Sequence, residues 1–187
     1  MDRAATNNFR PSGELVHSSE AVQSAIARQA AELRLRFADA CPLVLVLMQG
    51  AVYYAVWLTL ALAIPLELDY VDVGRYGDGH AGGALGWRRP PSKRVAGRSV
   101  LVVDDIFDEG ETLAAVCAAC NEAGASAVHT AVLARKRHDR ARAAAPDSAA
   151  LEVPDRFIVG CGLDYAGRWR NLPALYALDE SAFNASA

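Results

Sequence analysis

The stretch Val102-Val103-Asp104-Asp105-Ile106-Phe107-Asp108-Glu109-Gly110-Glu111-Thr112 decides how this 187-residue chain is interpreted. The apolar run at 99–103 predicts a buried strand, and Gly110 with the alanine-rich segment after it predicts a turn and then a helix. Such a turn offers backbone N–H groups and the positive end of a helix dipole, which suit a phosphate. Carboxylates at the strand end suit Mg²⁺ and ribose hydroxyls instead. The stretch therefore predicts a ligand site.

The same stretch also fits a simpler interpretation, an acidic cluster on a solvated loop, because carboxylates are common where strands leave a sheet. A P-loop is excluded, since no G-x-x-x-x-G-K-S/T sequence occurs in the chain.

Around this stretch the apolar pattern alternates between strand and helix. Helices are expected at about 19–37, with Ser18 as the N-cap, at 51–64 and at about 111–123. Strands are expected at 43–48, 66–73, 99–103, 127–133, 157–159 and 175–178. No compact element is expected at 74–97, which holds seven glycines and two adjacent prolines. This order predicts a single α/β domain over 1–187 with a mostly parallel sheet covered on both faces, and candidate disordered tails at 1–12 and 180–187.

Composition is that of a soluble globular protein, with 52% hydrophobic and 22% charged residues. The 19 basic and 22 acidic residues leave a formal charge of −3, so no overall positive field recruits nucleic acid, and small ligands are the expected partners. Residues 1–10 hold no apolar segment typical of a secretory signal, which predicts a cytoplasmic location.

Two local patterns have alternative interpretations. Residues 40–66 carry no charged side chain, which is long enough to cross a membrane, but Pro42, the Gln49-Gly50 step and Pro65 divide the run. A strand, a tight loop and a buried helix are expected there, and no membrane partner. Cys117 and Cys120 lie inside a predicted helix rather than at its start, so buried thiols are expected instead of a redox pair.

The stretch at 102–112 resembles the ribose-phosphate loop of the type I phosphoribosyltransferases, which bind 5-phosphoribosyl-1-pyrophosphate (PRPP). The nearest resemblance is to the bacterial hypoxanthine-guanine branch. It covers roughly residues 19–178, with further matches at 48–50, 135–140 and 155–165 in family order. The resemblance implies a three-layer α/β/α fold with a small hood from the terminal segments and a flexible lid at about 74–97.

For PRPP, the resemblance implies contacts of Asp104 and Asp105 with the ribose hydroxyls and Mg²⁺. The 5′-phosphate cradle would consist of Asp108, Glu109, Gly110, Glu111 and Thr112. Pyrophosphate would be held by Gln49, Gly50 and Arg170, and the lid would place Arg75 and Tyr76 over the site. The chain departs from the family at Gln49, where relatives often carry a basic residue, and at Asp104, where many carry glutamate. Glu109 and Glu111 add charges that would repel a phosphate unless they point outward.

For the purine, the resemblance implies Asp108 as the general base at N7 and Lys136 as the donor to the 6-oxo group. Phe157 would stack on the base, Ile158 would present backbone groups to its edge, and Asp164 would lie near position 2 and a second metal.

The implied activity is Mg²⁺-dependent transfer of the 5-phosphoribosyl group to N9 of hypoxanthine or guanine, which gives IMP or GMP and pyrophosphate in purine salvage. Three alternatives stay open: a nucleotide-sensing regulator with the same fold, a xanthine-preferring enzyme, and an unrelated sugar-phosphate binding protein. A homodimer or homotetramer is expected.

Overall fold

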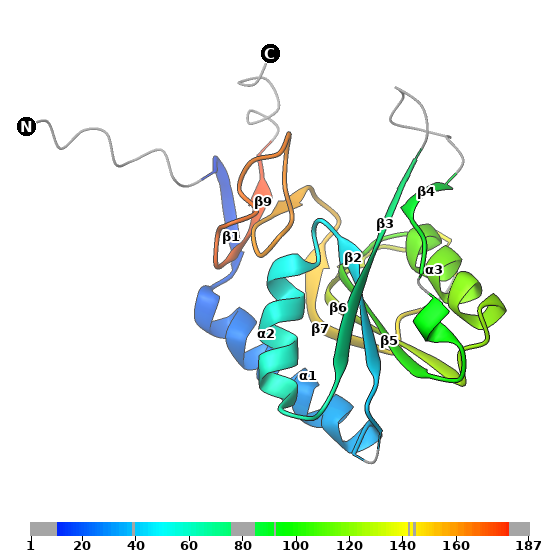
Figure 1. Cartoon of the computed structure of the whole chain (residues 1–187). Coiled ribbons are helices and arrows are strands. Elements are labelled where there is room, and N and C mark those ends of the chain that lie inside the picture. Colours follow the sequence, from blue (N-terminus) through cyan, green and yellow to red (C-terminus); the bar gives the residue numbers. More distant parts are fainter. Residues whose placement is uncertain are drawn as a thin grey trace, which may run out of the picture.

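Strands and helices alternate over residues 13–75, and four strands in succession end the described chain (Figure 1). The computed structural model describes residues 11–38, 40–75, 85–91, 93–141, 143 and 145–179. The helices are α1 (Ser19–Arg36), α2 (Val52–Leu62) and α3 (Glu111–Glu122), with a 3₁₀ turn η2 at Lys93–Val95. The strands are β1 (Gly13–His17), β2 (Leu43–Met48), β3 (Glu67–Arg75), β4 (Leu85–Arg89), β5 (Ser99–Phe107), β6 (Ala127–Arg137), β7 (Ser148–Pro154), β8 (Ile158–Val159) and β9 (Leu175–Leu178).

A six-stranded sheet in the order β4-β3-β2-β5-β6-β7 forms the middle layer. All neighbouring strands are parallel except β4, which runs antiparallel to β3. Figure 1 shows α1 and α2 on one face of the sheet and α3 on the other. The predicted three-layer α/β/α architecture is therefore confirmed.

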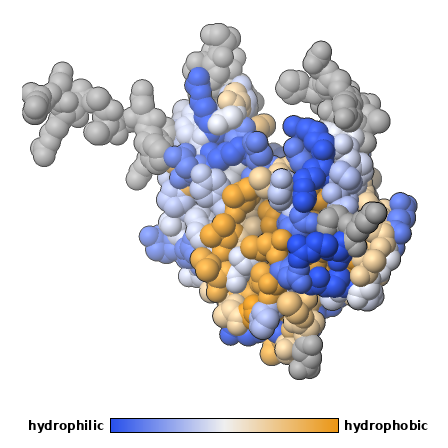
Figure 2. All heavy atoms as spheres, viewed as in Figure 1, coloured by the Kyte–Doolittle hydropathy of each residue, from blue (hydrophilic) through white to orange (hydrophobic). Residues whose placement is uncertain are grey.

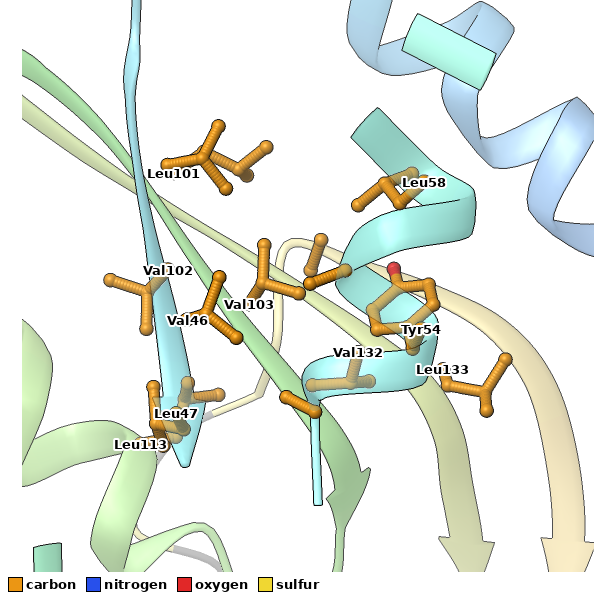
Figure 3. Close-up of a cluster of buried hydrophobic side chains, with 14 of the residues drawn as sticks. Val46, Leu47, Tyr54, Leu58, Leu101, Val102, Val103, Leu113, Val132 and Leu133 are labelled. Atoms are coloured by element: carbon orange, nitrogen blue, oxygen red, sulfur yellow. The ribbon is translucent and has the colours of Figure 1, made fainter. Parts of the chain in front are cut away.

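The core fills both spaces between the sheet and its helices (Figure 3). Successive residues of a strand point to opposite faces. Val46 and Val103 accordingly face Tyr54 of α2, while Leu47 and Val102 face Leu113 of α3. Because both faces are covered, the central strands are continuously apolar, as is usual for parallel sheets.

The helix predictions hold to within a few residues. Ser18 caps α1, its hydroxyl accepting from the Ala21 N–H at 3.3 Å. The uncharged run at 40–66 divides into β2, a loop and α2, which stops before Pro65. In the described part of the chain, no helix has the length and apolar character needed to span a membrane.

A second, three-stranded sheet, in the order β1-β9-β8, joins the two ends of the described chain and forms the predicted hood. Its strands pair antiparallel, and the Asp179 N–H donates to the Ser12 carbonyl at 3.1 Å. Residues 11 and 12, expected to belong to a disordered tail, are therefore part of this ordered end. Residues 1–10 and 180–187 lie outside the described residues.

Strands β5 and β6 are longer than their apolar runs predict. β5 continues from the expected end at 103 to Phe107, and β6 continues from 133 to Arg137. Asp104 pairs with Val132 and Phe107 with Arg135, so backbone hydrogen bonding carries both strands through their polar ends. Asp104, Asp105 and Lys136 consequently lie on strands rather than on loops.

The expectation that no compact element occupies 74–97 is wrong for residues 85–89, which form β4. Gly86 pairs with Gly74 of β3, and Arg89 forms an ion pair with Asp69 at 2.7 Å. Arg88 lies 3.5 Å from Asp72. The pairing and the opposite charges thus turn a glycine-rich, basic segment into a sheet edge.

Strand β7 was also not predicted, because its alanine-rich sequence carries a weak strand signal. Gln29 of α1 is buried and ties β7 to the core. Its amide donates to the Val132 carbonyl at 3.2 Å and to the Ser148 hydroxyl at 3.0 Å. Its carbonyl accepts from the Tyr54 hydroxyl at 2.6 Å, so the buried amide is satisfied.

Candidate active site

Two adjacent carboxylates lie near the carboxyl end of β5. Each accepts the backbone N–H of the next residue, Asp104 from Asp105 at 2.9 Å and Asp105 from Ile106 at 2.7 Å. Burial raises the pKa of Asp104 well above its usual value, and the charge of Asp105 adds to the shift. Burial also raises the pKa of Asp105, opposed in part by hydrogen bonds and by the charge of Arg170. A cation would relieve this repulsion.

These carboxylates fit Mg²⁺ as a shared ion rather than as one caged by the protein. Among the described residues no three His, Cys, Asp or Glu side chains come together as a metal site. Mg²⁺ commonly takes one or two carboxylates and completes its octahedron with phosphate oxygens and water. The hard oxygen donors of Asp104 and Asp105 match that mode.

The phosphate-sized turn follows β5 directly. Gly110 has φ 81° and ψ 8°, a left-handed conformation that favours glycine, and it precedes the first residue of α3. No side chain in the described structure caps this helix. A cavity of about 280 Å³ is lined by Asp104 and residues 106–113, and this lining includes every residue of the predicted phosphate cradle. Glu109 and Glu111 are exposed, and Thr112 is half-buried.

Three basic side chains converge on Asp108. Lys136 Nζ donates to Oδ2 at 2.7 Å, while His138 Nε2 and Arg140 NH2 each lie 2.8 Å from Oδ1. Burial acts to raise the pKa of Asp108, but Lys136, Arg140 and His138 together lower it below its usual value. Asp108 is therefore ionised at neutral pH and held by donors on both oxygens.

The tautomer of His138 follows from its neighbours. The backbone N–H of Arg140 lies 3.2 Å from Nδ1, and an N–H group can only donate. Nδ1 therefore accepts, and Nε2 carries the proton that it donates to Asp108. His138 thus fixes the orientation of the carboxylate through Oδ1.

A second cavity, of about 210 Å³, adjoins the acidic strand end and brings the predicted purine residues together. Its lining consists of Asp105, Ile106, Lys136, Phe157, Ile158, Leu163 and Asp164. Phe157 is 43% exposed, so its ring has surface left for stacking, whereas the Ile158 side chain is buried in the core. The Ile158 side chain is thus taken up by core packing, and a contact of its backbone with a ligand stays a prediction.

Two further aromatic rings pack in a chain with Phe157. Tyr165 meets it edge-on with 5.3 Å between ring centroids, and Trp169 stacks on Tyr165 at 6.3 Å. Such contacts fix the orientation of a ring at an otherwise open surface.

The loops at 49–51 and 160–170 complete the candidate site. Arg170 NH1 donates to the Gly162 carbonyl and NH2 lies beside Asp164 Oδ1, both at 2.6 Å. A Cβ at Gly50 would overlap Asp105 Oδ2, and one at Gly162 would overlap the Gly50 carbonyl. Glycine is therefore needed at 162, where two backbones meet, and at 50, where the backbone meets the Asp105 carboxylate. The Met48–Gln49 peptide bond is cis, and Gln49 is exposed.

The remaining predicted positions are placed less fully. Asp164 accepts from the Gly167 N–H at 2.7 Å besides pairing with Arg170, so its contact with a second metal stays a prediction. Arg75 ends β3, but its side chain and all of Tyr76 lie outside the described structure, as do residues 76–84 of the predicted lid.

Four side chains join the site without having been predicted: His138, Arg140, Tyr165 and Trp169. The first two belong to a charge run in which only Lys136 was assigned a role. Their position in the sequence could have indicated them, because they follow a strand that neighbours the strand carrying the carboxylates. The aromatic pair had a signal in its spacing of four residues within a loop that also follows Phe157.

Comparison with known proteins gives a consistent picture. The family model described as phosphoribosyl transferase domain matches residues 12–166. Hypoxanthine-guanine phosphoribosyltransferase of Bacillus subtilis is 32% identical over 167 residues, which cover 89% of this chain and 93% of that protein. The Streptococcus pneumoniae protein of the same name is 29% identical over 168 residues, with 89% and 93% covered. Among solved structures, a Staphylococcus aureus hypoxanthine phosphoribosyltransferase superposes with a TM-score of 0.85 at 22% identity, covering 91% of this chain and 93% of that one.

Proposed function

Because the chain belongs to the phosphoribosyl transferase domain family, we propose that it is a hypoxanthine-guanine phosphoribosyltransferase of purine salvage. It transfers the 5-phosphoribosyl group of PRPP to N9 of the purine and releases pyrophosphate. The observation that carries this proposal is the position of Asp108, which lines the cavity of about 280 Å³ beside the phosphate-sized turn and is bonded to Lys136 of the neighbouring cavity. One carboxylate thus lines the place proposed for PRPP and is bonded to a residue that lines the place proposed for the purine.

PRPP is proposed to enter with its 5′-phosphate on the backbone N–H groups at 109–112 and its ribose hydroxyls toward Asp104 and Asp105. The exposed positions of Glu109 and Glu111 reduce their repulsion of that phosphate. Asp104 and Asp105 would hold Mg²⁺, which would supply positive charge near the departing pyrophosphate.

As the bond to pyrophosphate breaks, the ribose gains oxocarbenium character and the leaving group gains negative charge. Arg170 and the backbone of the 49–51 loop are proposed to stabilise that charge. Asp108 removes the N7 proton while N9 attacks the anomeric carbon. Lys136 must release Asp108 Oδ2 for this step, while His138 retains Oδ1.

Lys136 is also proposed to select the base. An ammonium group donates hydrogen bonds, so it pairs with the 6-oxo group of hypoxanthine and guanine but not with the 6-amino group of adenine. Xanthine also carries a 6-oxo group, so a preference for xanthine is the alternative base specificity. Phe157, which lines the same cavity as Lys136, is proposed to stack on each of these bases.

An assay with purified protein tests this function. With PRPP and Mg²⁺, turnover of hypoxanthine and guanine should exceed that of adenine by about 100-fold or more, and EDTA should abolish it. Pyrophosphate release and nucleotide formation are both measured. PRPP binding without pyrophosphate release from any base would instead support a nucleotide-sensing regulator, and the highest kcat/KM with xanthine would support the xanthine enzyme.

A cytoplasmic location is proposed from the cysteines. Cys41, Cys117, Cys120 and Cys161 are all free thiols, which persist in a reducing compartment. Burial raises the pKa of both Cys117 and Cys120 to about 11, so neither is a reactive thiolate at neutral pH.

Self-association is proposed through the face of α2 and β3. Figure 2 shows apolar surface gathered there, and its exposed members are Tyr53, Val56, Leu60, Leu68 and Tyr70. A groove of about 270 Å³ runs between the two elements. α2 carries no charged residue, and Asp69 of β3, which lines the groove, is paired with Arg89 at 2.7 Å, so a copy related by a two-fold axis meets this face with little like-charge repulsion. We therefore propose a second copy of this chain as the occupant, and a homodimer at least.

The oligomeric state can be tested at Leu60, which is 74% exposed in this patch. Leu60→Glu should reduce the mass in sedimentation velocity to that of a monomer, because a buried unpaired carboxylate opposes the contact. Leu35→Glu is the matched control, since Leu35 is 82% exposed on α1 and outside the patch. A monomeric wild-type protein at micromolar concentration, or equal behaviour of the two variants, would contradict the proposal.

A further inference from the structure

Arg140 connects two loops of the candidate site through one guanidinium group. NH2 lies 2.8 Å from Asp108 Oδ1 and 3.0 Å from Asp155 Oδ1, and NH1 bonds the other oxygen of Asp155. Nε lies 3.6 Å from Glu109 Oε1. Asp108 and Glu109 belong to the loop after β5, whereas Asp155 follows β7. One side chain therefore meets three carboxylates from two segments.

The backbone reinforces the first of these contacts. The Ala143 N–H donates to the Glu109 carbonyl at 2.9 Å, so the turn that carries Arg140 is also bound to the phosphate loop through its backbone. The hydrogen bond from Arg140 is the largest influence on Asp155 and lowers its pKa. These contacts show that Arg140 is engaged with both loops in the ligand-free protein.

Each loop carries a group that matters for the proposed reaction. Glu109 places a negative charge beside the turn proposed to bind a phosphate, and like charges weaken such binding. Asp155 stands two residues before Phe157, the ring proposed to stack on the purine. A cation that pairs with both Glu109 and Asp155 can therefore influence the binding of both substrates without touching either.

Resting on the proposed function, we propose that Arg140 is a positioning residue that offsets the charge of Glu109 beside the PRPP phosphate and fixes the Phe157 segment relative to Asp108. The ion pairs are partly exposed, so their contribution to folding stability is small. Their contribution to substrate binding is larger, because the charge of Glu109 acts on the phosphate only when a ligand is present.

Arg140→Gln should raise KM for PRPP by about tenfold and KM for the purine by about threefold. Its kcat should change by less than about threefold, since Lys136 and His138 still hold Asp108. Arg137→Gln is the matched control, because Arg137 is exposed at the end of β6 and forms no side-chain ion pair within the described structure. Circular dichroism melting of both variants checks that folding is unchanged.

Two double variants separate the two effects. Adding Glu109→Gln to Arg140→Gln should return KM for PRPP to within about threefold of wild type but leave KM for the purine raised. Adding Asp155→Asn should raise KM for the purine no further, because Arg140 has already lost that partner. If Glu109→Gln gives no recovery, or if Arg140→Gln behaves as Arg137→Gln does, this inference alone fails. Absence of turnover by the wild-type protein with every purine would reject the proposed function, and this inference with it.

Discussion

Asp108→Asn is expected to lower kcat by about 10²–10⁴-fold while KM for PRPP and for the purine changes little. Asparagine keeps the size of the side chain and an oxygen for Lys136 to bond, but it cannot accept the N7 proton. The loss therefore falls on the step in which the proton moves. Initial rates with saturating PRPP and hypoxanthine measure it.

Asp139→Asn controls for loss of a negative charge in the same region, since Asp139 is exposed and has no proposed role. Equal kcat values for Asp108→Asn and Asp139→Asn would reject the general base. The pH profile gives a second check. Because basic neighbours lower the pKa of Asp108, its carboxylate stays ionised as pH falls, and its acid limb in kcat/KM should lie below the usual range of an aspartate.

The sequence was sufficient for the parts of the fold whose cause is local. Ser18 is followed by a periodic apolar stripe, and the α1 helix begins at the residue after it. The apolar run of β2 and the alternation of strands with helices predict a covered parallel sheet, because such strands must be buried on both faces. Gly110 was predictable as well, because the need for glycine there comes from its own left-handed backbone conformation.

Tertiary pairing decided the rest. Asp104 and Lys136 interrupt apolar runs, yet they remain in strands because neighbouring strands satisfy their backbones. The basic segment at 88–89 joins the sheet because acidic residues of β3 face it. This pairing brings together residues that are not neighbours in the sequence, so a local pattern does not reveal it. Arg140 was similarly hidden, since its three carboxylate partners lie 15 to 32 residues away. The role of a run of charged residues can therefore be assigned only when its partners in the fold are known.

Arg170→Gln is expected to lower kcat by about 10²–10³-fold, the effect of losing one preorganised donor to a developing negative charge. It should also raise KM for pyrophosphate in the reverse reaction with IMP. The structure gives a further reason for a large effect. The guanidinium holds the Gly162 carbonyl and Asp164 at 2.6 Å each, and its charge opposes the raised pKa of Asp105.

Without that charge, the paired carboxylates of β5 lose their positive neighbour, and the 160–170 loop loses both of its bonds to the side chain. The stability cost should be about 2 kcal/mol in urea unfolding, because both partners keep some access to water. Arg170→Lys retains the charge but not two donors in a fixed fork, so its kcat should fall between those of wild type and Arg170→Gln. Arg168→Gln, an exposed arginine of the same loop, should leave kcat unchanged. If Arg170→Gln lost stability but kept its kcat and its KM for pyrophosphate, Arg170 would be a structural clamp for the loop, and pyrophosphate stabilisation would have to come from the backbone at 49–51 alone.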